Sequence, residues 1–212
     1  MSRYVTCAVH SAPTKSPAVV TRQSEARLPT AHGTFTVYAY AASPDDRTPT
    51  LALVAEGTDF SKPVLTRLHS ECITGDVFHS LRCDCGAQLD RALELTGDEG
   101  GVVLYLRQEG RGIGITNKLD AYQLQDAGAD TVEANQRLGL PVDGRDYTGA
   151  IAVLQNLGVR SVRLLTNNPD KEAAFAKTGI AVTERVPIEI EKQPESERYL
   201  NTKRDAMGHQ IS

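Results

Sequence analysis

The protein has 212 residues, and its 23 lysines and arginines against 27 aspartates and glutamates give a formal net charge of −4. Apolar residues make up 40% and charged residues 24% of the chain, a composition that excludes intrinsic disorder, and the acidic balance excludes a broad nucleic-acid or membrane-surface binder. No apolar stretch approaches the roughly 20 residues of a membrane-spanning helix, and the length favours one domain.

Residues 1–24 differ in composition from the rest of the chain. They contain no Asp or Glu, and Pro13 and Pro17 interrupt them. A transit peptide needs an amphipathic helix, which these prolines disfavour, and the segment lacks the apolar core of a secretion signal. We therefore predict a loosely held leader at 1–24, one catalytic domain at 25–212 and a cytoplasmic location.

Beyond this segment, the apolar pattern predicts strands alternating with helices. Strands are predicted at 34–40, 51–55, 64–68, 102–106, 161–165 and 180–186, and helices at 85–96, 116–127, 149–157 and from a capping sequence at 167–170 to Gly179. This order predicts an α/β layered fold with a mixed β-sheet flanked by helices.

Three of the four cysteines, Cys72, Cys83 and Cys85, are spaced C-x10-C-x-C. Thiolates bind zinc strongly, and a zinc ion with three protein ligands keeps a fourth position for water. The alternatives are unligated core thiols, which the polar residues around Cys83 disfavour, or a disulfide, which would be strained between Cys83 and Cys85. The spacing leaves open whether His69 or His79 is a fourth ligand that closes the site.

A glycine-rich segment at 107–114 follows one predicted strand and precedes a predicted helix. Loop amides bind phosphate in this context, although neither of the two common nucleotide-binding glycine motifs is present. Arg67, Lys118 and Lys171 stand in neighbouring segments. Together these features predict a local site for an anionic substrate; the alternative is a glycine turn with solvated arginines.

The run Asp143 to Tyr147 contains two acidic residues that bracket Arg145. Such a run is usually a solvated surface loop. Tyr122, on the helix after the glycine-rich segment, has the spacing of an ordinary packing residue. Neither feature indicates function when it is considered alone.

Considered together, these motifs stand in an order and spacing that match a known family. The matching segments are 67–76, 80–86, 105–114, 130–135, 145–147 and 163–169. They resemble GTP cyclohydrolase II, the zinc enzyme that opens riboflavin biosynthesis, and the resemblance extends over roughly residues 25–210. It implies the fold of that family and a homodimer. It also implies the single-function form, without a fused dihydroxybutanone-phosphate synthase half.

The resemblance implies hydrolysis of GTP to formate, diphosphate and 2,5-diamino-6-ribosylamino-4(3H)-pyrimidinone 5′-phosphate. Cys72, Cys83 and Cys85 would be the three zinc ligands, with water as the fourth and His69 not a ligand. Zinc-bound hydroxide would attack C8 of the guanine ring. A Mg²⁺ ion is expected with the substrate phosphates. Nucleic acids and membranes are not expected as partners.

The family pattern makes Arg145 the nucleophile at the α-phosphorus, Asp143 its proton acceptor, and Tyr122 an aid to the loss of formate. Since a guanidinium is almost always protonated, a nearby carboxylate is what this role requires. The alternative is that Arg145 only stabilises phosphate charge. The resemblance assigns GTP contacts to Arg67, Leu68, His69, Ser70, Glu71, Gln88, Glu109, Gly110, Arg111, Thr131, Thr166 and Lys171.

Two residues depart from the family pattern. Asp120 stands where a basic residue is usual, and Ala129 stands where a larger residue is common. Neither is a matched catalytic position, so they bear on substrate affinity and product fate. Two alternatives follow: a paralogue that releases diphosphate but retains the formyl group, and a non-catalytic zinc protein that binds guanine nucleotide as a regulator.

Overall fold

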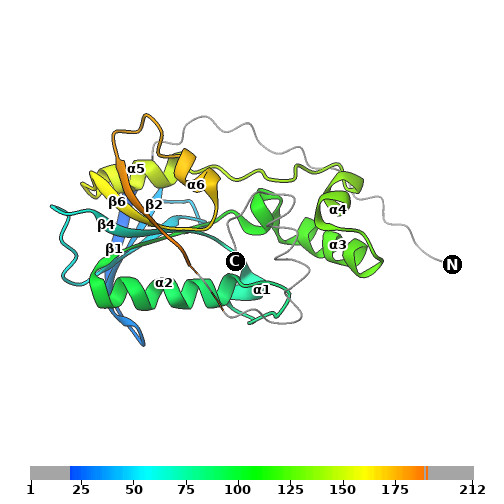
Figure 1. Cartoon of the computed structure of the whole chain (residues 1–212), viewed down its shortest axis with the longest axis horizontal. Coiled ribbons are helices and arrows are strands. Elements are labelled where there is room, and N and C mark those ends of the chain that lie inside the picture. Colours follow the sequence, from blue (N-terminus) through cyan, green and yellow to red (C-terminus); the bar gives the residue numbers. More distant parts are fainter. Residues whose placement is uncertain (1–19, 189, 191–212) are drawn as a thin grey trace.

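The fold is built on one seven-stranded sheet with the order β1-β2-β3-β5-β4-β6-β7 (Figure 1). The computed structural model describes residues 20–188 and 190. The strands are β1 (Thr21–Thr30), β2 (Gly33–Ala41), β3 (Thr50–Ala55), β4 (Val64–Ser70), β5 (Gly101–Leu106), β6 (Ser161–Leu165) and β7 (Ala181–Val186). Neighbouring strands among β1, β2, β3 and β5 pair antiparallel. Neighbouring strands among β5, β4, β6 and β7 pair parallel. The predicted mixed sheet is confirmed.

Helices cover both faces of this sheet. They are α1 (Ile73–Asp76), α2 (Cys85–Glu99), α3 (Gly114–Asp126), α4 (Thr131–Arg137), α5 (Thr148–Asn156) and α6 (Pro169–Ala173), with a 3₁₀ turn η1 (Glu109–Gly112). In Figure 1, α2 lies on one side of the sheet, α5 and α6 lie on the other, and α3 and α4 lie beyond its end. The predicted α/β layers are therefore present.

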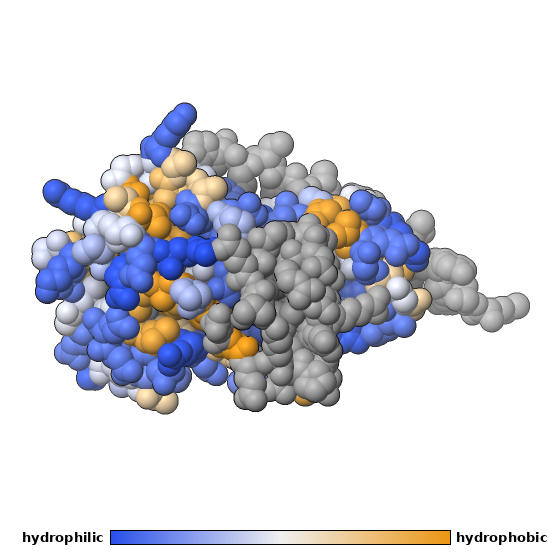
Figure 2. Space-filling model, viewed as in Figure 1, coloured by the Kyte–Doolittle hydropathy of each residue, from blue (hydrophilic) through white to orange (hydrophobic). Residues whose placement is uncertain are grey.

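Two apolar layers form the core because neighbouring side chains of a strand point to opposite faces. On β4, Leu65 packs in the layer of Ala92 from α2, whereas Leu68 packs in the layer of Leu154 from α5. A third, smaller cluster between α3 and α4 contains Ala121, Ala129 and Ala134. Figure 2 shows polar side chains over much of the described surface in that view. Among the described residues, no helix is both long and apolar enough to cross a bilayer.

The structure differs from the sequence-based expectation at several element ends. β1 begins at Thr21, inside the segment assigned to the leader, and pairs with β2 along its length; the leader residues 1–19 lie outside the described residues. The helix α6 ends at Ala173, short of the predicted Gly179, and Lys177 takes a left-handed φ of 62° that breaks helical continuity. Two helices, α1 and α4, were not predicted.

The parallel half of the sheet determines where a ligand can bind. The chain runs from β4 to β5 on one side of β4 and later to β6 on its other side. Such a reversal opens a crevice outside the carboxyl ends of parallel strands, where α/β proteins bind ligands. The segments that follow β4, β5 and β6 begin at 71, 107 and 166. Each of these segments carries candidate site residues.

Candidate active site

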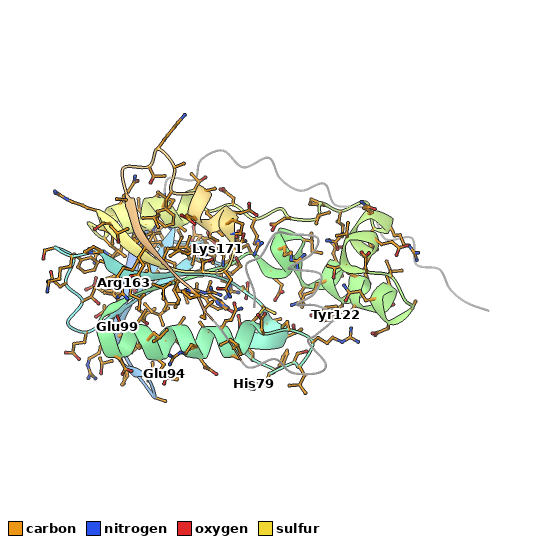
Figure 3. All side chains as sticks on the ribbon, in the orientation of Figure 1. His79, Glu94, Glu99, Tyr122, Arg163 and Lys171 are labelled. Atoms are coloured by element: carbon orange, nitrogen blue, oxygen red, sulfur yellow. The ribbon has the colours of Figure 1, made fainter. Side chains whose placement is uncertain are left out.

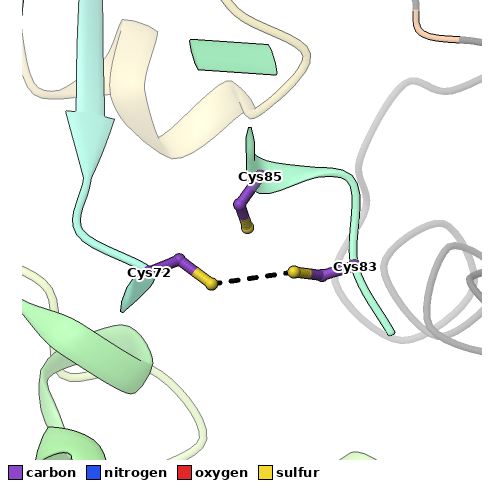
Figure 4. Close-up of side chains that lie close together, drawn as sticks. All are labelled: Cys72, Cys83 and Cys85. Atoms are coloured by element: carbon purple, nitrogen blue, oxygen red, sulfur yellow. Dashed lines mark hydrogen bonds between the residues drawn. The ribbon is translucent and has the colours of Figure 1, made fainter. Parts of the chain in front are cut away.

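The three clustered cysteines come from two segments that meet at the carboxyl end of β4. Cys72 lies between β4 and α1, Cys83 lies two residues before α2, and Cys85 is the first residue of α2. Their Sγ atoms all lie within 4.8 Å of one another, and those of Cys72 and Cys83 are 3.6 Å apart (Figure 4). All three cysteines are free of disulfides. Zinc–sulfur bonds of about 2.3 Å in a tetrahedron place sulfurs about 3.8 Å apart, so the donor set fits a zinc ion.

Two glycines allow the cysteine segments to approach so closely. A Cβ atom on Gly86 would lie 2.3 Å from the carbonyl oxygen of Gly75, and a Cβ on Gly75 would lie 2.9 Å from the Sγ of Cys83. Both distances are far below a normal contact. The start of α2 therefore packs on α1 backbone to backbone, and this contact brings the thiols together.

The buried carboxylate of Asp76 is hydrogen-bonded to the backbone of the cysteine cluster. Asp76 accepts hydrogen bonds from the backbone N–H of Cys72 at 2.9 Å and from the hydroxyl of Tyr105 at 2.9 Å, and its Oδ1 lies 3.1 Å from Nε2 of His69. The Asp76 and His69 side chains are each only 2% exposed. Burial lowers the pKa of His69, and this effect outweighs the bond to Asp76, which would raise it. The ring is therefore neutral and donates its Nε2–H to the carboxylate.

The sequence left His69 and His79 open as a fourth metal ligand, and the structure brings neither of them into the thiol cluster. The Nε2 atom of His69 faces Asp76, and His79 lies on an exposed loop (Figure 3). Within the described part of the chain, the one cluster of three metal-ligating side chains consists of the cysteines alone. A metal held by these three thiols would have an open coordination position.

The Asp76→Asn variant should be less stable than the wild type by about 1–3 kcal/mol, because the neutral amide loses charge-assisted bonds from three buried donors. Urea unfolding of the zinc-loaded proteins measures the difference. Asp45 is exposed, so Asp45→Asn is the matched control and should change stability by less than about 0.5 kcal/mol. Equal unfolding free energies for both variants would show that Asp76 does not support the cluster.

A lysine from α3 also reaches the cysteine cluster. The Nζ atom of Lys118 donates to the Sγ of Cys72 at 3.1 Å, to the Oγ1 of Thr74 at 2.9 Å and to the Oε1 of Glu109 at 2.8 Å. Burial works to lower the pKa of Lys118, but the bond to Glu109 and the proximity of Cys72 raise it above its ordinary value. Lys118 is therefore a buried ammonium group beside the thiols.

A cavity of about 490 Å³ opens beside the thiols. It is lined by every predicted site residue except Leu68 and Asp143. The predicted residues that line it are Arg67, His69, Ser70, Glu71, Cys72, Cys83, Cys85, Gln88, Glu109, Gly110, Arg111, Tyr122, Arg145, Thr131, Thr166 and Lys171. The two departures from the family pattern are placed differently: Ala129 lines the cavity, and Asp120 does not.

The two exceptions lie next to the cavity rather than in its wall. The side chain of Leu68 is fully buried in the core, and its carbonyl oxygen accepts a hydrogen bond from Nζ of Lys171 at 2.6 Å. Asp143 lies behind Arg145, whose Nε donates to both carboxylate oxygens at 3.0 Å. Burial raises the pKa of Asp143, but hydrogen bonds from Arg145 outweigh burial and lower it, so the carboxylate is ionised.

The glycine-rich segment is hydrogen-bonded to the loop that carries Arg145. The backbone N–H of Gly144 donates to the carbonyl of Arg111 at 2.9 Å, and a Cβ on Gly112 would lie 2.8 Å from the carbonyl oxygen of Gly144. Arg111 itself takes a left-handed φ of 62°, which is uncommon for a residue other than glycine and is often found at functional sites. This contact joins two segments whose arginines, Arg111 and Arg145, both line the cavity.

Two more cations line the cavity from within the fold. Arg67 is 4% exposed and Lys171 is 5% exposed. The guanidinium of Arg67 donates to the Oε1 of Gln88 at 2.6 Å and to the carbonyl of Leu165 at 3.1 Å. These cations give the wall of the cavity a positive charge that suits an anionic ligand.

Two cations lie near the ring of Tyr122, which lines the cavity from α3. The guanidinium carbon of Arg82 is 4.8 Å from the ring centroid, and Nζ of Lys118 is 5.7 Å from it. Arg82 in turn pairs with Asp126 at 2.5 Å. Burial raises the pKa of Tyr122, which keeps the phenol protonated and able to donate. Figure 3 shows Tyr122 at the far end of the molecule from Glu99 and Arg163.

The comparisons with known proteins agree with this arrangement. Residues 21–187 match the family model described as GTP cyclohydrolase II. Proteins named riboflavin biosynthesis protein RibBA are similar: that of Salinispora tropica is 60% identical over 188 residues and that of Nocardia farcinica 56% over 194, which is 88% and 91% of this chain. The chain spans 47% of the length of each.

One solved structure is also similar, at a much lower level. The crystal structure of RibBX, a two-domain 3,4-dihydroxy-2-butanone 4-phosphate synthase from A. baumannii, matches 81% of this chain and 40% of that chain. The sequence identity is 16% and the TM-score is 0.44, a likeness too weak to carry an argument.

Proposed function

Because this chain belongs to the GTP cyclohydrolase II family, we propose that it hydrolyses GTP in riboflavin biosynthesis. The reaction opens the imidazole ring at C8, releases formate and diphosphate, and yields 2,5-diamino-6-ribosylamino-4(3H)-pyrimidinone 5′-phosphate. One observation carries the proposal: a single cavity of about 490 Å³ joins the three-thiol cluster to several cations. This volume is within the usual range for a small-molecule site.

The thiols of Cys72, Cys83 and Cys85 would hold a zinc ion at the cavity wall. When bound with an open position, zinc supplies a hydroxide at neutral pH by lowering the pKa of a water ligand to about 7. Two contacts hold the three thiols close together: the close packing of Gly75 on Gly86, and the hydrogen bond from the Cys72 amide to Asp76. A Mg²⁺ ion with the substrate phosphates, a homodimer and a cytoplasmic location remain predictions.

The guanine end of the substrate is assigned to Glu109. Its carboxylate is oriented by the backbone N–H groups of Ile73 at 2.6 Å and Gly110 at 2.7 Å, and by Lys118. A carboxylate has about four acceptor positions, so these three donors leave about one of them to accept a hydrogen from N1 or the amino group of guanine. Under this assignment, the guanine ring and its C8 would lie in the cavity that Glu109 and the thiols both line.

The phosphate end is assigned to the cations, with Arg145 as the reacting group. A bond forms between a guanidine nitrogen and the α-phosphorus, the bond from that phosphorus to the oxygen shared with the β-phosphate breaks, and diphosphate leaves. Water would later hydrolyse the nitrogen–phosphorus bond, which frees Arg145 and leaves the 5′-phosphate of the product. The nucleophilic nitrogen must lose a proton, and the ionised carboxylate of Asp143 lies 3.0 Å from Nε of Arg145. Tyr122, a protonated phenol, is assigned to proton donation as formate is lost.

The zinc-loaded protein, incubated with GTP and Mg²⁺, should release formate and diphosphate in equal amounts. Enzymatic assays of both products and mass spectrometry of the pyrimidine measure this outcome. Release of diphosphate with a product that keeps the formyl carbon would identify the formamide-forming paralogue. Binding of GTP without release of either product would identify a nucleotide-binding regulator, and both outcomes would overturn the proposed reaction.

A further inference from the structure

Lys118 connects the two halves of the site through one buried ammonium group. It donates from α3 to Cys72 in the thiol cluster and to Glu109 at the guanine end, and it also donates to Thr74. Its side chain is 11% exposed, and that of Glu109 is 10% exposed. The ammonium therefore lies between a predicted metal ligand and a predicted substrate ligand, largely out of water.

The number of donors limits what Lys118 can do. An ammonium group has three N–H donors and no acceptor, and the three contacts of Nζ account for all of them. Lys118 is therefore not free to donate to a bound nucleotide while these bonds persist. Its effect on the site must pass through the groups that it holds.

The charge of the cluster indicates what that effect is. Three thiolates around one Zn²⁺ ion carry a net charge of −1, and the Glu109 carboxylate adds another negative charge nearby. Negative charge that is buried without a partner is costly. A cation at 3.1 Å from the Cys72 sulfur and 2.8 Å from Glu109 offsets both.

We propose that Lys118 is a positioning residue that balances the charge of the metal–thiolate cluster and holds Glu109 in the orientation that receives guanine. The guanine half of this inference rests on the proposed hydrolysis of GTP, and the metal half rests on zinc binding by the three thiols. Groups that contact metal ligands typically change metal affinity or activity by about 10- to 100-fold when they are replaced. Loss of Lys118 should therefore weaken the metal site and substrate binding together.

The test compares Lys118→Met and Lys118→Gln, which remove the charge, with Lys118→Arg, which keeps it. Lys62 is exposed and pairs with Asp59 on the surface, so Lys62→Met is the matched control. Zinc affinity is measured by competition with a chelator, and circular dichroism checks that each variant is folded. We expect about a 10- to 100-fold loss of zinc affinity in the two neutral variants, a smaller loss in Lys118→Arg and none in Lys62→Met.

Two further readouts separate charge balance from simple packing. In the cobalt-substituted protein, the thiolate-to-cobalt absorption should shift in the neutral variants, because the charge beside one sulfur has changed. In the zinc-loaded enzyme, KM for GTP should rise as kcat falls, because Glu109 has lost one of its anchors.

The outcomes distinguish this inference from the proposed function. Wild-type zinc affinity and an unchanged cobalt spectrum in folded Lys118→Met and Lys118→Gln would overturn the inference, as would equal losses in all three Lys118 variants. Failure of the wild-type protein to turn over GTP would instead overturn the proposed function. The zinc-affinity measurement does not depend on turnover, so the metal half of the inference is tested in either case.

Discussion

The Arg145→Ala variant should lose diphosphate release by at least about 10³-fold while its zinc content stays at the wild-type level. Alanine removes the proposed nucleophile, whose guanidinium bonds to Asp143, and it leaves the three thiols unchanged. Stopped assays with GTP measure diphosphate, and metal analysis of the same samples measures zinc. Arg137 is exposed on α4, so Arg137→Ala is the matched control and should keep wild-type activity.

The Arg145→Lys variant separates the two roles that Arg145 can have. A lysine keeps the positive charge but does not reproduce the planar guanidinium fork beside Asp143. If Arg145 only stabilises phosphate charge, Arg145→Lys retains a substantial part of the rate. If Arg145 is the nucleophile, rapid quenching of the wild type with labelled GTP traps a guanylyl adduct that is absent from Arg145→Ala. Turnover by Arg145→Ala within about tenfold of the wild type would refute both roles.

The Cys83→Ser variant should lose bound zinc and with it the release of formate. A serine hydroxyl is a poor replacement for a soft thiolate, and only two thiols of the cluster remain. We expect zinc content below about a tenth of the wild-type value after dialysis, and formate release reduced by at least about 10²-fold. Metal analysis and a formate assay on the same preparation measure the two losses.

The fourth cysteine provides the control for this prediction. Cys7→Ser makes the same chemical change outside the C-x10-C-x-C segment, at a position outside the described residues. It should leave both zinc and formate release unchanged. Full formate release by zinc-free Cys83→Ser would show that ring opening does not use this cluster.

The sheet was predictable where burial imposes a pattern on the sequence. The strand β5 is buried along almost its whole length, and its run of Val and Leu residues shows it. The strands β4 and β6 carry Val and Leu at buried positions beside polar residues. The strand β1 is exposed along almost its whole length, so no apolar alternation marks it and only pairing with β2 defines it. The helix α1 has four residues, too few for any helical period. The helix α4 had a detectable signal, because the side chain of Asp130 caps it at the N–H of Glu133.

The site was predictable only where its residues are close in sequence. Three cysteines within one short segment indicate a metal without any knowledge of the fold. Arg145 and Tyr122 show no such signal, because tertiary contacts alone bring their segments to the cavity, and their assignment came from the family resemblance. Lys118 was noted as a nearby cation, but its contact with Cys72 joins segments 46 residues apart and no spacing rule predicts it.

The contact between Gly75 and Gly86 also determines how the gene can change. Every missense change at either codon adds at least a Cβ atom, and at Gly86 that atom would overlap a backbone oxygen that cannot move aside as a side chain can. Neither glycine offers a donor, a charge or a ligand atom of its own from a side chain. Substitutions at these two codons should nevertheless be tolerated as poorly as substitutions at the cysteine codons. A mutation at either glycine can therefore destroy the thiol cluster while all three cysteines remain.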